Sequence, residues 1–213
     1  MRLRIDPDQP PWCPEWDGEL RVSSIQTGVF AGPLGSPVGQ HRFHPDVVVR
    51  EEQPAERLHT PRYAIIETRL RASADPRCMV ALWMIGYEDR PERSGEICVV
   101  EIFGRDVAVG RAGVGLGVHP HHDGRIRDDF ERVPLAIDAT AAHDYAVVWR
   151  ADGLAWYVDG GLVRTVDQPI GYPMQLMLGI YGFPDADAGP GDPFAAPAGV
   201  FDVDWVRTWR PAS

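Results

Sequence analysis

The sequence predicts a single all-β domain, a sandwich of two antiparallel sheets. The chain has 213 residues, which is enough for one large sandwich and short for two domains. Its 22 Gly and 20 Pro indicate many turns. Short stretches of alternating apolar and polar residues lie between these turns, and no long helical period is present. We therefore expect residues 1–213 to form one domain.

The N-terminal third gives the weakest pattern. Residues 1–20 are rich in Pro, Asp and Trp without a clear period, so an extended arm over a sheet is predicted. Residues 20–30 are typical of a strand, and residues 31–40 of a Gly- and Pro-rich loop. A short strand is predicted within residues 42–50.

The remainder alternates more clearly. Residues 79–86 form a continuous apolar run, which indicates a strand buried on both faces or facing a cleft. Residues 144–166 form the clearest hairpin, with turns at Ala151-Asp-Gly and Asp159-Gly-Gly. The other predicted strands are residues 60–72, 94–104, 173–180 and 200–209, with a strand pair joined by Gly turns at 107–119. A solvent loop is predicted at 120–124 and a further loop at 184–197.

The strand 94–104 carries a carboxylate near each end. In a regular strand Glu96 and Cys98 share one face while Glu101 points to the other, where a buried unpaired carboxylate would be costly. One extra residue, a β-bulge between Cys98 and Glu101, returns Glu101 to the face of Glu96. Leaning side chains would then bring the two carboxyl groups to about 5–5.5 Å, the separation found in retaining glycosidases.

Charge and cysteine content exclude some partners. A net charge of -10 and a pI near 5.1 speak against nucleic acid and anionic membranes. No apolar run reaches membrane-spanning length, and residues 1–7 lack the apolar core of a leader. A cytoplasmic protein is predicted, or a secreted one if a leader was removed. The sparse cysteines, Cys13, Cys78 and Cys98, fit a reducing compartment, with a Cys13–Cys78 bridge as the alternative.

Four motifs resemble glycoside hydrolase family 16, the family of laminarinases, lichenases and agarases. Glu96-x-Cys98-x-x-Glu101 is similar to the family's Glu-x-Asp-x-x-Glu on a bulged strand. The other motifs are Tyr63 with Glu67 and Arg69, the Tyr145-x-x-x-Trp149…Tyr157-Val-Asp-Gly hairpin, and the two closing strands, in the family's order from Tyr63 to Trp209. The resemblance implies a concanavalin A-like jelly roll with a concave cleft.

The same resemblance implies a retaining hydrolase or transglycosylase acting on a β-linked glucan or galactan. Glu96 would be the nucleophile and Glu101 the general acid/base. Cys98 stands where the family has an Asp that helps to set the protonation of both glutamates, and a neutral thiol cannot replace the charge of that Asp. The alternative is a non-catalytic carbohydrate-binding protein. The expected partner is a polysaccharide or oligosaccharide, and the oligomeric state is left open.

Further site residues follow from the resemblance and from side-chain chemistry. No cofactor is expected to be required. The family suggests a structural calcium ion at Asp204, with Asp185 and Asp187 as a weaker second candidate, whereas zinc at the clustered histidines 119, 121 and 122 lacks supporting partners. Trp149 and Trp156 are expected to be structural. The expected substrate-binding residues are Gln40, His41, Trp83, His119 and Tyr181, with Phe183 and Arg42 beside them.

Overall fold

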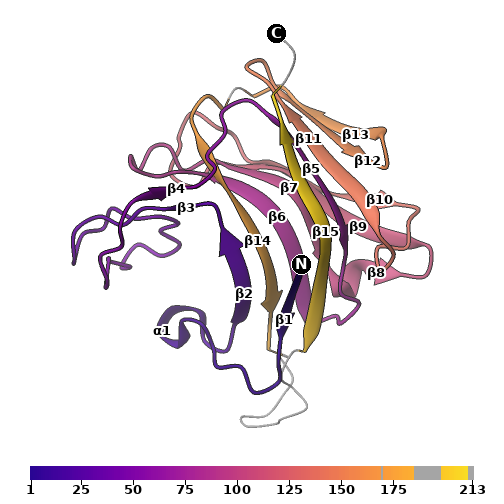
Figure 1. Ribbon diagram of the computed structural model, residues 1–213, viewed down its shortest axis with the longest axis horizontal. Helices are drawn as coiled ribbons and strands as arrows, with labels where there is room; N and C mark the ends of the chain where they lie inside the picture. The colour runs from indigo at the N-terminus through magenta and orange to yellow at the C-terminus, as the bar shows by residue number, and fades with distance from the viewer. Residues whose placement is uncertain (169, 185–197, 211–213) are drawn as a thin grey trace.

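The protein is a β-sandwich of two large antiparallel sheets that face each other (Figure 1). The computed structural model describes residues 1–168, 170–184 and 198–210. One sheet has six strands in the order β1-β15-β5-β11-β12-β13. The other has seven, in the order β10-β9-β7-β6-β14-β2 with β8 beside β9, and β3 and β4 form a separate pair. This jelly roll confirms the predicted fold class.

The strands agree with most of the predicted ranges. The six-stranded sheet consists of β1 (Arg2–Ile5), β15 (Gly199–Trp209), β5 (Ile65–Arg71), β11 (His143–Trp149), β12 (Leu154–Val158) and β13 (Gly161–Val166). The seven-stranded sheet consists of β10 (Asp129–Leu135), β9 (Arg111–His119), β7 (Glu96–Phe103), β6 (Cys78–Gly86), β14 (Met174–Gly182), β2 (Arg21–Gln26) and β8 (Val107–Ala108). The remaining elements are β3 (Gly28–Val29), β4 (Glu56–Arg57), α1 (Pro14–Asp17) and a 3-10 turn, η1 (Gly104–Asp106).

Alternate residues of the facing strands fill the space between the sheets. In β5 the inward side chains Ile66 and Leu70 are fully buried, as the period of two requires. Each such aliphatic side chain contributes about 1.5–3 kcal/mol to the free energy of unfolding. Trp149 and Trp156, on the neighbouring strands β11 and β12 of the same sheet, pack in the same cluster and are also fully buried, as expected for structural residues.

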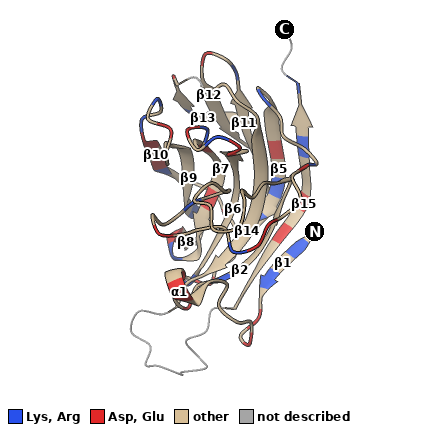
Figure 2. Cartoon of the chain, turned by 90° about the vertical axis from the view of Figure 1, so that its left-hand side faces the viewer, with Lys and Arg blue, Asp and Glu red and all other residues tan. Residues whose placement is uncertain are grey.

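The seven-stranded sheet has a second apolar patch on its other face. Ala81, Trp83 and Ile85 of β6 form this cluster, with Met177 and Tyr181 of β14 packed against it. Figure 2 shows β6 and β14 free of charged residues over their length, whereas β5 and β15 carry several. A strand that is apolar on both faces therefore lies at the centre of this sheet, and its outer face is available to form a cleft.

Three segments differ from the prediction. Residues 1–20 were expected to be an extended arm, but they contribute the edge strand β1, paired with β15, and the short helix α1. Residues 42–50 were expected to contain a strand, and this is wrong. The segment instead makes single backbone bonds, such as Val49 N–H to Ser36 O at 2.9 Å, because its apolar side chains cover a pocket. The edge strand β10, in which no residue is fully buried, was not predicted.

The structure also bears on the predicted disulfide alternative and on membrane-spanning helices. Cys13, Cys78 and Cys98 are all free thiols, so the alternative of a Cys13–Cys78 bridge is wrong. Within the described ranges no helix is long and apolar enough to cross a membrane.

Candidate active site

A β-bulge in β7 brings the two glutamates to one face. Against β9, Cys98 pairs with Gly117 and Glu101 with Gly115. The two strands therefore advance by different amounts: three residues along β7 correspond to two residues along β9. The register with β6 shifts at the same place. Val99 and Val100 consequently both point into the core between the sheets, and Glu101 returns to the face of Glu96 and Cys98. The predicted bulge is confirmed.

The core of the sandwich anchors this bulge. The indole N–H of Trp156, on β12 of the opposite sheet, donates a buried hydrogen bond of 2.8 Å to the carbonyl oxygen of Cys98. A bulge disrupts the regular ladder, and a buried carbonyl without a donor is destabilising. Trp156 was predicted only as core, but it also fixes the strand segment that sets the spacing of Glu96 and Glu101.

Glu96 lies in a polar environment. Its carboxylate Oε2 is 2.7 Å from Nε2 of His121, and its side chain is only 13% exposed. His119 of β9 lies directly across the ladder from Glu96. Nδ1 of His119 is 2.8 Å from the Asp128 carboxylate, and its ring stacks on Phe130. The predicted cleft residue His119 is therefore beside Glu96, while the direct partner of Glu96 is His121.

Glu101 lies in a more apolar environment made by small residues and rings. Its ladder neighbours are Ala81 of β6 and Gly115 of β9. A Cβ at Gly115 would lie 2.5 Å from the Phe130 ring, so this ring covers the glycine. No donor among the described residues is hydrogen-bonded to the Glu101 carboxyl. Burial, followed by the negative charge of Glu96, raises the pKa of Glu101 above its ordinary value, against the lowering effects of Arg132, His119 and Arg105.

Cys98 lies between the two glutamates but makes no hydrogen bond to either. Its side chain is 1% exposed, and its thiol is 3.6 Å from the carbonyl oxygen of Gly115, to which it donates. Burial and then the charges of Glu101 and Glu96 raise the pKa of the Cys98 thiol. A thiol nucleophile requires the opposite environment, so Cys98 is a neutral spacer.

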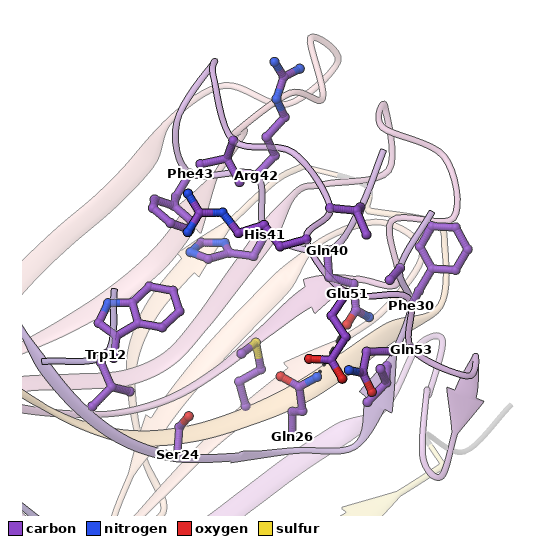
Figure 3. Close-up of a pocket in the computed structure, with 18 of the residues that line it drawn as sticks. Trp12, Ser24, Gln26, Phe30, Gln40, His41, Arg42, Phe43, Glu51 and Gln53 are labelled. Atoms are coloured by element: carbon purple, nitrogen blue, oxygen red, sulfur yellow. Dashed lines mark hydrogen bonds between the residues drawn. The ribbon is translucent and has the colours of Figure 1, made fainter. Parts of the chain in front are cut away.

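A cavity of about 560 Å³ is lined by side chains of β14 and β2 and extends to Trp83 of β6, and the two glutamates lie outside its lining. Trp83 lies between β7 and β14, since it pairs with Cys98 on one side and Met177 on the other. Figure 3 shows Trp12, His41 and Phe43 at one end of this pocket. Its lining also includes Ser24, Gln26, Phe30, Gln40, Arg42, Glu51, Gln53, Gln175 and Tyr181.

Four of the five predicted substrate-binding residues line this pocket: Gln40, His41, Trp83 and Tyr181. The indole N–H of Trp83 donates to the Tyr181 hydroxyl at 3.1 Å, and burial raises the pKa of Tyr181 to about 12. Phe183 instead stacks on Phe103 at 5.8 Å. The fifth residue, His119, lies on the other side of Glu96.

A buried glutamate supports the pocket wall. Glu88 is 3% exposed, and its carboxylate accepts the backbone N–H of His41. Burial raises the pKa of Glu88 to about 7, against the lowering effects of this hydrogen bond and of His121. The His41 ring lies edge-on to Trp83 at 5.2 Å and to His121 at 5.7 Å. Glu88 therefore holds the side chain that connects the pocket to the glutamates.

Three of these residues were not found from the sequence. His121 was placed in a solvent loop, and Glu88 was placed in a connecting loop without a role. Gln175 was seen only as part of a strand, yet its Oε1 is buried without a partner among the described residues. The cluster of histidines after Pro120 was the one available signal, because the other contacts depend on how distant loops meet.

The calcium prediction at Asp204 gains no support from the described residues. Among them, no group of three or more His, Cys, Asp or Glu side chains is placed to hold a metal ion. The Asp204 carboxylate lies 3.6 Å from Nε of Arg69 instead. Calcium takes several oxygen ligands, backbone carbonyl oxygens among them, so the site at Asp204 stays a prediction. The second candidate, Asp185 and Asp187, falls outside the described residues.

Comparison with known proteins gives the same architecture. The fold is similar to a GlcNAcα1-4Gal-releasing endo-β-galactosidase from Clostridium perfringens, with a TM-score of 0.76 and 24% identity over 99% of this chain and 52% of that chain. It is also similar to the catalytic domain of a laminarinase from Thermotoga petrophila, with a TM-score of 0.56 and 21% identity over 73% of this chain and 66% of that chain. The chain thus spans about half of the first protein and about two thirds of the second.

A sequence-family comparison is more specific than these structural likenesses. No curated protein sequence matches the chain. Residues 57–207, however, match the model of the glycosyl hydrolases family 16, and this range contains β7 with both glutamates, β6 with Trp83 and the loop with His121. Because the match covers well over half of its residues, the chain belongs to family 16 of the glycosyl hydrolases.

Proposed function

We propose that the protein is a retaining glycoside hydrolase or transglycosylase acting on a β-linked glucan or galactan. Glu96 attacks the anomeric carbon, and the leaving oxygen takes a proton from Glu101. In the second step a water molecule, or an acceptor hydroxyl, attacks the glycosyl-enzyme and gives its proton to the Glu101 carboxylate. The bulge that returns Glu101 to the face of Glu96 is the observation that carries this proposal.

The environments of the two glutamates support this division of roles. A general acid must hold its proton before the reaction, and burial raises the pKa of Glu101. A nucleophile must be ionised, and Glu96 has a hydrogen-bonding partner in His121. The family supports glycosidase chemistry in general.

The pocket supports a saccharide substrate. Aromatic faces stack on sugar rings, and side-chain amides both donate to and accept from hydroxyl groups. Trp83 and Tyr181 supply rings beside the amides of Gln26, Gln40 and Gln175. The unpartnered Oε1 of Gln175 would accept a hydrogen bond from a hydroxyl. A chain of sugars would extend from the scissile bond at β7 across Trp83 into this pocket. No cofactor takes part in this chemistry.

A second candidate function rests on Cys98. The strand lacks the family's middle Asp, so a carbohydrate-binding protein that uses the same cleft without turnover is the alternative. Such a protein would bind oligosaccharides tightly, and replacing Glu96 would change only local contacts.

The test is release of reducing sugar from a panel of β-glucans, β-galactans and their oligosaccharides between about pH 4 and 8. We expect turnover by the wild type and none by Glu96→Gln, which removes the nucleophile but keeps the shape of the side chain. Binding of an oligosaccharide by both proteins, without turnover by either, would overturn the enzymatic proposal in favour of the binding protein.

A further inference from the structure

His121 contacts Glu96, the proposed nucleophile. Glu96 lies on β7, whereas His121 lies in the loop after β9. Its Nε2 lies 2.7 Å from Oε2 of Glu96, and the two side chains are 32% and 13% exposed. The family's own arrangement places a tuning residue on the strand, at the position of Cys98. Cys98 makes no such bond, because its thiol donates to the carbonyl oxygen of Gly115. The polar partner of Glu96 therefore comes from the loop after β9.

That loop is tied to the start of β7 by two buried connections. The backbone N–H of His122 donates to Oγ of Ser94 at 2.8 Å, and Ser94 is fully buried. The hydroxyl of Tyr172 accepts the backbone N–H of Gly95 at 2.8 Å and donates to the Asp123 carboxylate at 2.9 Å. The residues on the C-terminal side of His121 are thus bonded to the residues just before Glu96.

The backbone of His121 is also in an unusual conformation. Its φ of 44° lies in the left-handed region, which non-glycine residues adopt infrequently. An edge-on contact with the His41 ring at 5.7 Å packs its imidazole from the pocket side. A strained conformation held by surrounding contacts is typical of functional positions.

We propose that His121 is the positioning residue of Glu96: it donates a hydrogen bond that orients the carboxylate and stabilises its charged form, in place of the strand residue that Cys98 has replaced. This inference rests on the proposed function. The imidazole does not touch the sugar, and its effect passes through Glu96. A hydrogen bond to the ionised form of a carboxylate favours that form.

The charges around His121 are consistent with a protonated donor. Burial lowers the pKa of His121, but the hydrogen bond and charge of Glu96 outweigh this and raise the pKa above its ordinary value. Neighbouring charged and titratable groups face it from several elements: Glu88 after β6, Asp128 before β10, His119 at the end of β9 and His41 from the pocket loop.

The first test measures the pair without using activity. The ring signals of the seven histidines are followed by NMR against pH, and the His121 signal is assigned by its loss in His121→Asn. We expect the His121 midpoint to fall in Glu96→Gln, because that variant removes the charge that stabilises the imidazolium. An unchanged midpoint would overturn the proposal. This result holds whether or not a substrate is found, so it is separate from the proposed function.

The second test uses the enzyme. Asn tolerates a positive φ, so His121→Asn keeps the turn while losing the imidazole. We expect kcat to fall about 10- to 100-fold with little change in KM, as for one lost hydrogen bond to a charged partner, and the loss to be largest at acid pH. His143→Asn is the matched control, since His143 forms a 2.7 Å pair with Asp159 on the other sheet. Equal kinetics for both variants, with an active wild type, would overturn the proposal.

Discussion

The two ends of β7 carry the same functional group in different environments. At one end, Glu96 contacts His121 and lies across the ladder from His119. At the other end, Glu101 has Ala81 and Gly115 as ladder neighbours, and the Phe130 ring covers the glycine. The first environment offers a hydrogen-bonding partner to the carboxylate, whereas burial in the second raises the pKa of Glu101.

This difference supports the proposed roles of Glu96 as nucleophile and Glu101 as general acid/base. The bulge places both carboxyl groups on one face, but it does not distinguish them. The distinction comes from the neighbours, because loops bring polar partners to Glu96 and glycines leave room for an aromatic ring beside Glu101. A carboxyl group whose pKa is raised by its surroundings, as for Glu101, is the usual candidate for the general acid.

The largest expected effect comes from removing each carboxyl group in turn. Glu101→Ala should reduce cleavage of a natural linkage about 10²- to 10⁴-fold, the usual contribution of a general acid/base. It should keep rapid glycosylation with an aryl glycoside whose leaving group needs no proton. Glu96→Ala should lose both reactions, since no nucleophile remains. Pre-steady-state release of the aryl group measures this step.

Added azide distinguishes the two roles further, because the small anion fits where a carboxylate was removed. With Glu101→Ala it should attack the glycosyl-enzyme and give a β-glycosyl azide. With Glu96→Ala it should attack the substrate directly and give the α-product. The opposite pair of products would reverse the assignment of the two ends.

A smaller effect is expected from Glu88, which supports the Glu96 end through His41. Its pKa is raised to about 7, so the folded protein binds more protons than the unfolded chain between about pH 4.5 and 7. Stability from this group is therefore full below about pH 4.5 and is lost as the pH rises through 7. Glu88→Gln keeps an acceptor for the His41 N–H but no longer titrates. The difference in the free energy of unfolding, Glu88→Gln minus wild type, should therefore be about 3 kcal/mol more positive at pH 8 than at pH 4.

Urea denaturation at pH 4, 6 and 8 measures this change. Glu52→Gln is the matched control, because Glu52 also accepts a backbone N–H, from Leu34, but is exposed. A difference between Glu88→Gln and wild type that is the same at all three pH values would contradict a raised pKa at this position.

The sequence predicted the fold better than the site. Strands that alternate, such as β5 and the β11–β12 hairpin, are specified by local pattern, because the buried face must be apolar. The strand β10 was missed because it is an edge strand whose residues are half-buried or exposed, so it lacks a clear apolar face. Residues 42–50 look like a strand, since apolar residues that cover a pocket and those that join a sheet are alike in composition.

Within the site, the bulge was predictable from chemistry and the loop contacts were not. Glu101 could not face the core, so its return to the face of Glu96 followed from the cost of burying a charge. The bond from His121 to Glu96 depends on the hydrogen bond from His122 to Ser94 and on those that join Gly95 to Asp123 through the Tyr172 hydroxyl. These links join segments far apart in the sequence, and no local period records them.

The smallest expected effect comes from Cys98, midway between the two ends. Cys98→Asp restores a negative charge next to both glutamates, and a like charge raises the affinity of a carboxylate for its proton. Glu101 would then stay protonated to higher pH, so the alkaline limb of the pH–rate profile should move up by about one unit. Cys98→Asn has the shape of Asp without its charge and is the control, with circular dichroism to show that a polar group at this buried position leaves the fold intact. Equal profiles for the two variants would mean that charge at the middle of β7 does not affect Glu101, and that the surroundings of each glutamate act independently.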